Sequence, residues 1–319
     1  MKRTFATPLA FKAALEARLA ERAQGGGRTI NRVRQLLVTQ RFLVRVVETL
    51  DAVVLKGGIV MELRLDRARA TRDVDLRVNA SPDDLLDRLR EAARRDVGDQ
   101  LVFEVERDAD LPIIEAEGLR FEGQRFRVRT TLAGRRYADA FGVDVAIGEP
   151  IVGTPTEVVG DDLLRFVGIP APVFRAYPVP THVAEKLHAY TMPRPKPNSR
   201  VKDLPDIALL ATVADLDASA LAAAIRETFA HRATHLPPGS LPEPAVAWEP
   251  VYARMATADG LPWGTLADLT QAVRAFLDPV LAGADGKWDP DAWIWRQDRN
   301  GLEPARAENE PDPTSERAR

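Results

Sequence analysis

Apolar and polar positions follow two different periods along the chain, and the change between them separates helices from strands. The helical period covers about 8–23 and 29–50, and three glycines at 25–27 separate these segments. A short apolar strand over 53–58 follows, then a helix near 59–66 and a strand over 73–78. Ser81 and Pro82 favour the start of another helix, which runs to about residue 95.

Strand patterns dominate the middle of the chain and helical patterns its last third. The pattern predicts strands near 101–107, 112–117, 119–121 and 125–132, a later one around residue 144, and helices from about residue 180. Prolines at 193–197 and 237–250 interrupt these helices. We therefore expect an α/β (α+β) protein with a mixed sheet. Its regions would be a core with N-terminal helices over 1–179, a helical C-terminal domain over 180–299 and a disordered tail over 300–319.

Composition limits the class of protein. With 319 residues, 45% of them hydrophobic and 29% charged, the chain is typical of a globular protein that buries a sizeable core. No cysteine is present, which excludes disulfides, thiolate zinc sites and a cysteine nucleophile. The basic residues Lys2 and Arg3 are not followed by an uninterrupted apolar stretch. We expect a cytoplasmic protein that has no membrane partner.

Positive charge gathers near the N-terminus, although the net charge of the chain is −3. The first fifty residues contain ten Lys and Arg but three Glu. Several arginines share the predicted helix 29–50 with an apolar stripe and could present a basic edge to nucleic acid or triphosphate. The alternative is an ordinary solvated helix face. The arginines concerned are Arg28, Arg32, Arg34, Arg41 and Arg45.

Two carboxylates lie one residue apart on the predicted strand 73–78. Because strand side chains alternate, Asp73 and Asp75 share one face, whereas Val74 lies on the face that a sheet buries. Their repulsion raises at least one pKa unless a cation lies between them, and Mg²⁺ prefers carboxylate oxygens supplemented by water and phosphate. The pair predicts a metal site. The alternative is a solvated strand end.

Two further features favour phosphate chemistry. Lys56 precedes the glycine pair Gly57-Gly58, whose backbone N–H groups can approach a triphosphate without interference from a Cβ atom. Asp144 lies on an apolar strand, where a carboxylate is costly unless a cation pairs with it. Three acids and a glycine turn suit nucleotidyl transfer with two metal ions. In that scheme Asp144 joins the ion nearer the acceptor hydroxyl.

A second group of charged residues follows in the helical region. Lys186 points off the apolar stripe of a helix that begins near Thr181. In the next helix the simple account makes Asp203 the N-cap and Asp206 a first-turn anion that the helix dipole favours, and a role in the site is the alternative, which capping does not exclude. Cations here would neutralise triphosphate charge. The candidate phosphate contacts are Lys186, Arg200 and Lys202, and Arg72 beside the first acid joins the nucleotide-binding set.

These motifs together resemble the AbiEii-type nucleotidyltransferase toxins of the DNA-polymerase-β-like superfamily. The resemblance covers roughly residues 40–215, in order and spacing. The motifs that carry it are Lys56-Gly57-Gly58, the run from Arg69 to Leu76, Val143-Asp144-Val145, the run from Ala184 to Ala189, and the run from Arg200 to Asp206.

The resemblance implies a polymerase-β-like core and a toxin of a toxin–antitoxin or phage abortive-infection pair. Such a toxin would use a nucleoside triphosphate and Mg²⁺, modify an RNA such as the 3′ end of tRNA, inhibit translation and bind a cognate antitoxin protein. It further implies that Asp73 and Asp75 are the polymerase-like acids and that Lys186 and Asp203 form a family-specific pair. One departure is Ile59, at a position where many relatives have Ser or Thr to hydrogen-bond a phosphate.

Two other functions remain open from the sequence. Ile59 and the modest basicity are compatible with a non-catalytic nucleotide- or RNA-binding module, and the core also suits a small-molecule transferase of the antibiotic-modifying kind. Two weaker signals are separate from these. His231 and His235 have a spacing that could hold zinc, but Pro237 follows closely. The tryptophans at 263, 288, 293 and 295 are expected to be core or interface anchors.

Overall fold

The structure is a computed structural model of the chain. It describes residues 5–26, 28–65, 71, 73–114, 122–148, 151–194, 200–213 and 215–297. The expected tail at 300–319 and the candidate nucleotide contact Arg72 lie outside these residues.

The elements follow the expected succession of N-terminal helices, mixed strands and C-terminal helices. The helices are α1 (Pro8–Gly26), α2 (Ile30–Val47), α3 (Gly57–Arg64), α4 (Leu85–Arg94), α5 (Val179–Thr191), α6 (Asp203–Ala211), α7 (Ala218–Arg232), α8 (Glu249–Asp259) and α9 (Leu266–Leu281). The strands are β1 (Val54–Lys56), β2 (Asp73–Val78), β3 (Leu101–Arg107), β4 (Glu122–Leu132), β5 (Arg135–Arg136), β6 (Phe141–Ile147), β7 (Thr156–Val159), β8 (Val173–Ala176), β9 (Lys287–Asp289) and β10 (Ile294–Arg296).

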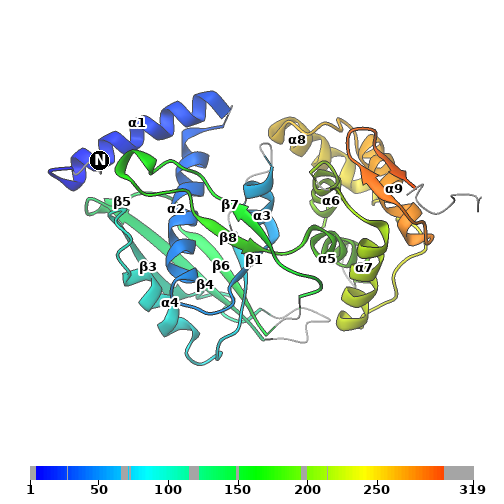
Figure 1. Cartoon of the computed structure of the whole chain (residues 1–319), viewed down its shortest axis with the longest axis horizontal. Coiled ribbons are helices and arrows are strands. Elements are labelled where there is room, and N and C mark those ends of the chain that lie inside the picture. The colour runs from blue at the N-terminus through cyan, green and yellow to red at the C-terminus, as the bar shows by residue number, and fades with distance from the viewer. Residues whose placement is uncertain are drawn as a thin grey trace, which may run out of the picture.

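The main sheet confirms the expected mixed α/β class. Its strands run in the order β3-β4-β6-β2-β1-β8-β7 within the described residues, and β5 pairs with β4. The pairs β2–β6 and β1–β8 are parallel, and the other neighbouring pairs are antiparallel. Figure 1 shows this sheet on one side of the molecule and the helices α5 to α9 on the other.

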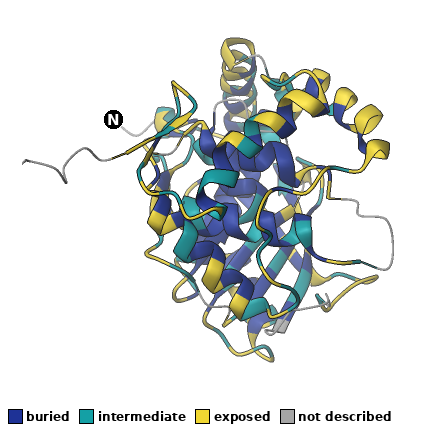
Figure 2. Ribbon diagram, turned by 90° about the vertical axis from the view of Figure 1, so that its right-hand side faces the viewer, coloured by how far each residue is buried: buried dark blue, intermediate teal, exposed yellow. Residues whose placement is uncertain are grey.

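Helices α2 and α4 cover one face of the sheet. The alternate residues Val74, Leu76 and Val78 of β2 are buried on this face, in a cluster that includes Leu36 of α2 and Leu89 of α4. Figure 2 shows buried residues through the middle of the fold and exposed ones at its rim. Because strand residues alternate, Asp75 in the middle of β2 lies on the opposite face, whereas Asp73 at the start of the strand borders a cavity beside α2.

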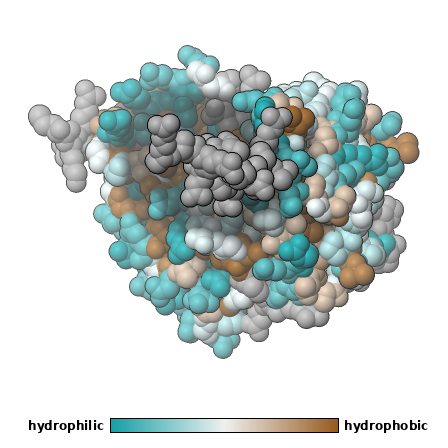
Figure 3. All heavy atoms as spheres, turned by 45° about the vertical axis from the view of Figure 1, so that its right-hand side comes forward, coloured by the Kyte–Doolittle hydropathy of each residue, from teal (hydrophilic) through white to brown (hydrophobic). Residues whose placement is uncertain are grey.

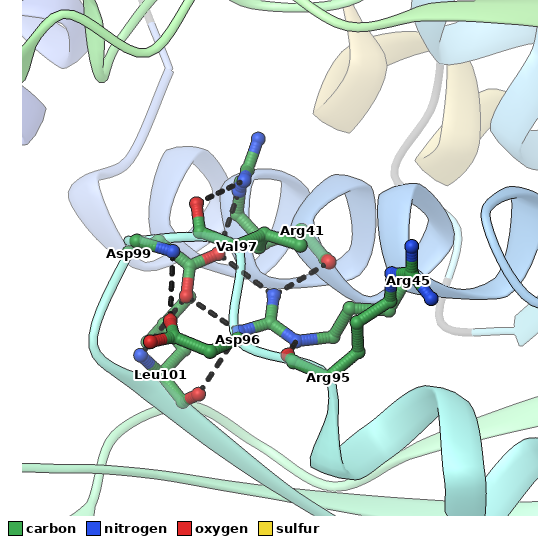
Figure 4. A network of polar contacts seen from close by, with 8 residues as sticks. Arg41, Arg45, Arg95, Asp96, Val97, Asp99 and Leu101 are labelled. Carbon is green, nitrogen blue, oxygen red and sulfur yellow. Dashed lines mark hydrogen bonds and ion pairs between the residues drawn. The ribbon is translucent and has the colours of Figure 1, made fainter.

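A buried ion-pair cluster anchors α2 and corrects one expectation. Arg41 Nε lies 2.7 Å from Asp99 Oδ2, and Arg45 Nη2 lies 2.6 Å from Asp99 Oδ1. Arg45 also donates to the carbonyls of Arg95 and Leu101, and Figure 4 shows how these groups converge. Arg41 and Arg45 are 4% and 1% exposed. Their expected place on an exposed basic edge is therefore wrong, because a distant carboxylate draws them inward.

The C-terminal helices enclose a hydrophobic cluster of their own. Trp288 is buried in it, and the partly buried side chains of Trp263, Trp293 and Trp295 pack against it. Trp288 and Trp295 contact the ring of Phe276. The expected anchoring role of the tryptophans is confirmed for the core of this half. The boundary between residues 179 and 180 stays a prediction.

The surface shows no dominant apolar region on the visible side. In Figure 3 hydrophilic residues predominate on this face, and hydrophobic ones are scattered in small groups. None of the described helices combines the length and the apolar character that a membrane crossing requires.

Candidate active site

A row of four charged residues crosses four neighbouring strands. Lys56 of β1 pairs in register with Asp75 of β2, Asp75 with Asp144 of β6, and Asp144 with Arg125 of β4. Residues directly opposite each other on paired strands lie on the same face, about 5 Å apart. The sheet therefore places two carboxylates side by side and flanks them with a cation at each end.

Two glycines leave space for the carboxylates of β2, Asp75 and Asp73. Gly57 has a φ of +65°, and a Cβ atom at this position would collide with the Asp75 carboxylate. A Cβ atom on Gly142 would lie 2.5 Å from Asp73 Oδ1. We expected Gly57 to leave space for phosphate, but the structure shows that it also leaves space for the acid.

Repulsion and burial make Asp75 a weaker acid than usual. Burial is the main cause, and the neighbouring charges of Asp144 and Asp73 add to it, so the pKa of Asp75 rises to about 6 despite the cations Lys56 and Lys186. A carboxylate whose pKa is raised in this way gains much from a bound cation. The electrostatics therefore favour a metal ion beside Asp75.

Arg125 forms two hydrogen bonds to the carboxylate of Asp144. Its Nε and Nη2 atoms donate to the two Asp144 oxygens at 2.6 and 2.7 Å. Among the described residues, no group of three His, Asp or Glu side chains is arranged to hold a metal ion. The carboxylates of Asp73 and Asp75, beside the space that Gly57 and Gly142 leave, are of the hard oxygen type that Mg²⁺ prefers.

A second charged cluster joins the first turn of α6 to α5. Lys186 Nζ lies 3.2 Å from Asp203 Oδ1 and 2.6 Å from Asp206 Oδ2. Asp206 is in the first turn of α6, as expected, but Lys202 is the residue at the N-cap position and forms no side-chain cap. The expectation that Asp203 is the N-cap is therefore wrong. Asp203 belongs to the helix, and its carboxylate turns toward Lys186.

Most of the predicted site residues line one cavity of 420 Å³ between the acid face of the sheet and the helices α5 to α7. Asp73 is exposed and borders a second cavity of 470 Å³, which α2, α3 and the sheet enclose. Gly58 and Lys202 are not part of the first cavity's wall, and Lys202 is exposed. The predicted residues that line the first cavity are Lys56, Gly57, Asp75, Asp144, Lys186, Arg200 and Asp203.

Sequence reasoning missed several residues of the first cavity. Arg125 of β4 reaches the first cavity because it pairs in register with Asp144 of β6, and the local sequence does not reveal this pairing. His182 lies four residues before Lys186 on α5, so the helical spacing was an available signal. The missed residues are Arg125, His182, Glu185, His188, Arg194 and Arg232.

Two earlier expectations concern residues at the edge of this site. Ile59 is 1% exposed and borders the second cavity, so its side chain does not face the first cavity. His235 lies beyond the end of α7, and its Nε2 atom hydrogen-bonds with Thr191 Oγ1 at 2.8 Å. His231 and His235 therefore do not share a helix, and the spacing behind the zinc hypothesis does not place them on one helical face.

The fold and the site define a nucleotidyltransferase. Two carboxylates lie beside a glycine turn on a mixed sheet, and they face a cavity that lysines and arginines line, which is what transfer from a nucleoside triphosphate requires. Residues 41–284 match the family model described as "Nucleotidyl transferase AbiEii toxin, Type IV TA system". The chain belongs to this family, so the resemblance seen in the motifs is confirmed.

Three solved structures are similar in part. MenT4, a nucleotidyltransferase toxin from Mycobacterium tuberculosis, is 16% identical with a TM-score of 0.49, over 87% of this chain and 92% of that one. JHP933 from Helicobacter pylori is 16% identical with a TM-score of 0.40, over 61% and 74%. A putative nucleotidyltransferase from H. pylori is 15% identical with a TM-score of 0.41, over 77% and 93%. No curated protein sequence matches the chain.

Proposed function

We propose that this chain is a toxin that transfers a nucleoside monophosphate from a nucleoside triphosphate to an RNA acceptor, the 3′ end of tRNA, and so inhibits translation in the cytoplasm. The acceptor hydroxyl gives up its proton to Asp144 and its oxygen attacks the α-phosphorus. A new P–O bond to the acceptor forms, the bond between the α-phosphorus and the bridging oxygen breaks, and pyrophosphate leaves. The observation that carries the proposal is the charged row of β1, β2, β6 and β4 facing the Lys186 cluster across one cavity.

Each part of the cavity has a role in this reaction. Asp73 and Asp75 would hold Mg²⁺, which supplies positive charge to the reacting and leaving oxygens when bound. Lys186 and Arg200 would bind the triphosphate, together with Lys56 and the N–H groups at the start of α3. Asp144 would contribute near the acceptor hydroxyl after Arg125 releases it. Lys202 and Arg72 are proposed as outer contacts to the nucleotide.

The proposed partners follow from charge and from the family. Arg125, Arg194, Arg200 and Arg232 line the cavity and suit a polyanionic acceptor such as RNA. The family is one of type IV toxin–antitoxin systems. A cognate antitoxin protein is therefore proposed as the second partner.

The test is nucleotide incorporation into RNA. Purified protein is incubated with total bacterial RNA, Mg²⁺ and each of the four α-³²P-labelled nucleoside triphosphates. We expect one RNA class to be labelled, the label to disappear with EDTA, and Asp73→Ala to lower incorporation at least about a hundredfold by removing a metal ligand. Asp87→Ala is the matched control, because the Asp87 side chain is 84% exposed on α4, away from the cavity.

Growth arrest on expression gives the second measurement. Asp73→Ala should abolish arrest while the folded protein still accumulates. An Asp73→Ala protein that stays toxic would contradict the proposal. Label that appears in extracts without RNA would indicate a small-molecule acceptor, and tight nucleotide binding without any incorporation would indicate a binding module.

A further inference from the structure

His182 is a buried polar side chain that the proposed reaction does not yet use. It lies in the first turn of α5 and is 1% exposed. Neither ring nitrogen has a hydrogen-bond partner within the described chain. Buried polar groups are nearly always hydrogen-bonded, because an unpaired one costs free energy, so each exception needs an explanation.

The position of His182 supplies that explanation. His182 lines the 420 Å³ cavity together with Lys56, Gly57 and Lys186. His182 and Lys186 are four residues apart on α5 and therefore lie on the same face of the helix. His182 therefore lies beside Lys186 at the wall that would face a nucleotide, with both ring nitrogens buried behind its surface.

The surrounding charges fix the form of the imidazole and the charge of its ligand. Burial chiefly, and then the cations Lys186, Arg64 and Lys56, lower the pKa of His182 to about 3, although Asp206 opposes them. The ring is therefore neutral at pH 7 and offers one N–H donor. Because Lys56 and Lys186 lie close by and the N-terminus of α3 begins at Gly57, the ligand that fits here is an anion with acceptor oxygens.

The turn itself offers no side-chain donor to such an anion. Gly57 and Gly58 have no side chain, and the Ile59 side chain is apolar and borders the other cavity. The imidazole of His182 is therefore a buried, unused hydrogen-bonding group on the α5 wall of the first cavity.

We infer that His182 positions the nucleotide, its ring N–H donating to a phosphate oxygen of the triphosphate bound over the Gly57-Gly58 turn. The inference rests on the proposed function for the identity of the phosphate donor. It assigns to α5 the side-chain hydrogen bond that the glycine turn lacks. His182 is a positioning residue and does not itself exchange a proton with the reacting atoms.

Inorganic tripolyphosphate is the probe, because it tests the phosphate contact without base, sugar or catalysis. Its affinity is measured by calorimetry for wild type, His182→Ala, His182→Gln and the control His231→Ala, which changes a histidine outside the cavity wall. We expect His182→Ala to weaken binding about tenfold, since a hydrogen bond to a charged group is lost. His182→Gln keeps an N–H donor and should recover most of the affinity, and His231→Ala should match wild type.

Circular dichroism and thermal melting show whether each variant is folded. If His182→Ala does not fold, the comparison of wild type with His182→Gln and His182→Leu decides, with Leu expected to bind weakly and Gln well. Unchanged tripolyphosphate affinity in folded His182→Ala or His182→Leu would overturn the inference, as would equal losses in the Gln and apolar variants.

Incorporation assays separate this inference from the proposed function. Transfer by wild type combined with unaltered tripolyphosphate binding in folded His182→Ala would leave the function standing and remove the role of His182. The reverse result, weakened binding in His182→Ala without transfer to any acceptor by wild type, would keep the phosphate contact and remove the proposed reaction. For an active protein, His182→Ala should raise the KM for the nucleotide more than it lowers kcat.

Discussion

Two clusters of buried charge in this molecule use the same residue types in opposite ways. The first joins Arg41, Arg45 and Asp99, and both Asp99 oxygens accept from guanidinium groups in a closed site (Figure 4). The second lines the 420 Å³ cavity, where His182 and one oxygen of Asp203 have no partner. A cluster in which every polar atom is hydrogen-bonded has no group left to bind a ligand. A cluster with unpaired polar atoms beside a cavity does have such groups. The difference separates the charges that hold the fold from those that we propose to serve a reaction.

The strongest way to break the cluster of Arg41, Arg45 and Asp99 is to remove its carboxylate. Asp99→Asn leaves Arg41 and Arg45 buried without an anion, which should lower the free energy of unfolding by about 3 to 5 kcal/mol. Urea denaturation followed by circular dichroism measures it. Asp87→Asn on the surface should change stability by less than about 0.5 kcal/mol. Similar stabilities for Asp99→Asn and Asp87→Asn would mean that the buried ion pairs of Asp99 with Arg41 and Arg45 do not stabilise the fold.

The cluster of Arg41, Arg45 and Asp99 also predicts that the stability of the fold decreases in acid. Burial alone would raise the pKa of Asp99, but the hydrogen bonds and charges of Arg45 and Arg41 outweigh it and hold the pKa below its usual value. Its contribution to stability is therefore complete above the ordinary aspartate pKa and is lost as the pH falls through the lower, folded-state value. The stability difference between wild type and Asp99→Asn should narrow in acid.

In the cavity cluster, Lys186→Met should have a larger effect on function than on folding. It removes the cation shared by Asp203 and Asp206, so we expect nucleotide incorporation to fall at least about a hundredfold through lost charge stabilisation. Stability should fall by about 1 to 2 kcal/mol, less than for Asp99→Asn, because Asp203, whose pKa burial already raises, can take up a proton once the shared cation is gone. If nucleotide incorporation by Lys186→Met falls only as far as the fraction of folded protein falls, the role of Lys186 is only structural.

Asp75→Asn is expected to have the smallest effect on stability, and it should stabilise the protein where the other substitutions destabilise it. The folded chain raises the pKa of Asp75 to about 6, so the penalty on the folded state grows as the pH rises above the ordinary aspartate pKa and is complete above the raised value. Below both pKa values the penalty is absent. Asp75→Asn should therefore stabilise the protein at pH 7.5 by about 1 to 2 kcal/mol and have little effect at pH 4. Thermal melts at both pH values measure it. A destabilised Asp75→Asn at pH 7.5 would contradict the penalty that burial places on the ionised Asp75 carboxylate.

Local pattern was enough for much of the fold. The alternation of β2 placed Asp73 and Asp75 opposite Val74, and the apolar spacing located α1, α2 and α5. These elements are set by side chains that lie close together in the sequence, which is why a periodic pattern reveals them.

What the sequence did not reveal depends on contacts between distant segments. Arg125 meets Asp144 through the pairing of β4 with β6, and Arg45 meets Asp99 over a separation of 54 residues. A helix pattern cannot tell a buried arginine from an exposed one when its partner lies elsewhere. The N-cap expectation for Asp203 failed because α6 begins one residue earlier, with Lys202 at the N-cap position, and the ion pair of Asp203 with Lys186 joins two separate helices.

The row of charges across β1, β2, β6 and β4 makes the site depend on strand alignment. In β6, Val143 and Val145 flank Asp144 and are both buried. A single inserted or deleted residue before Asp144 would put a valine beside Asp75 and turn the acid into the hydrophobic core. The buried valines therefore enforce the strand alignment, because a chain that shifts Asp144 by one residue also exposes its core and loses the stability of the fold.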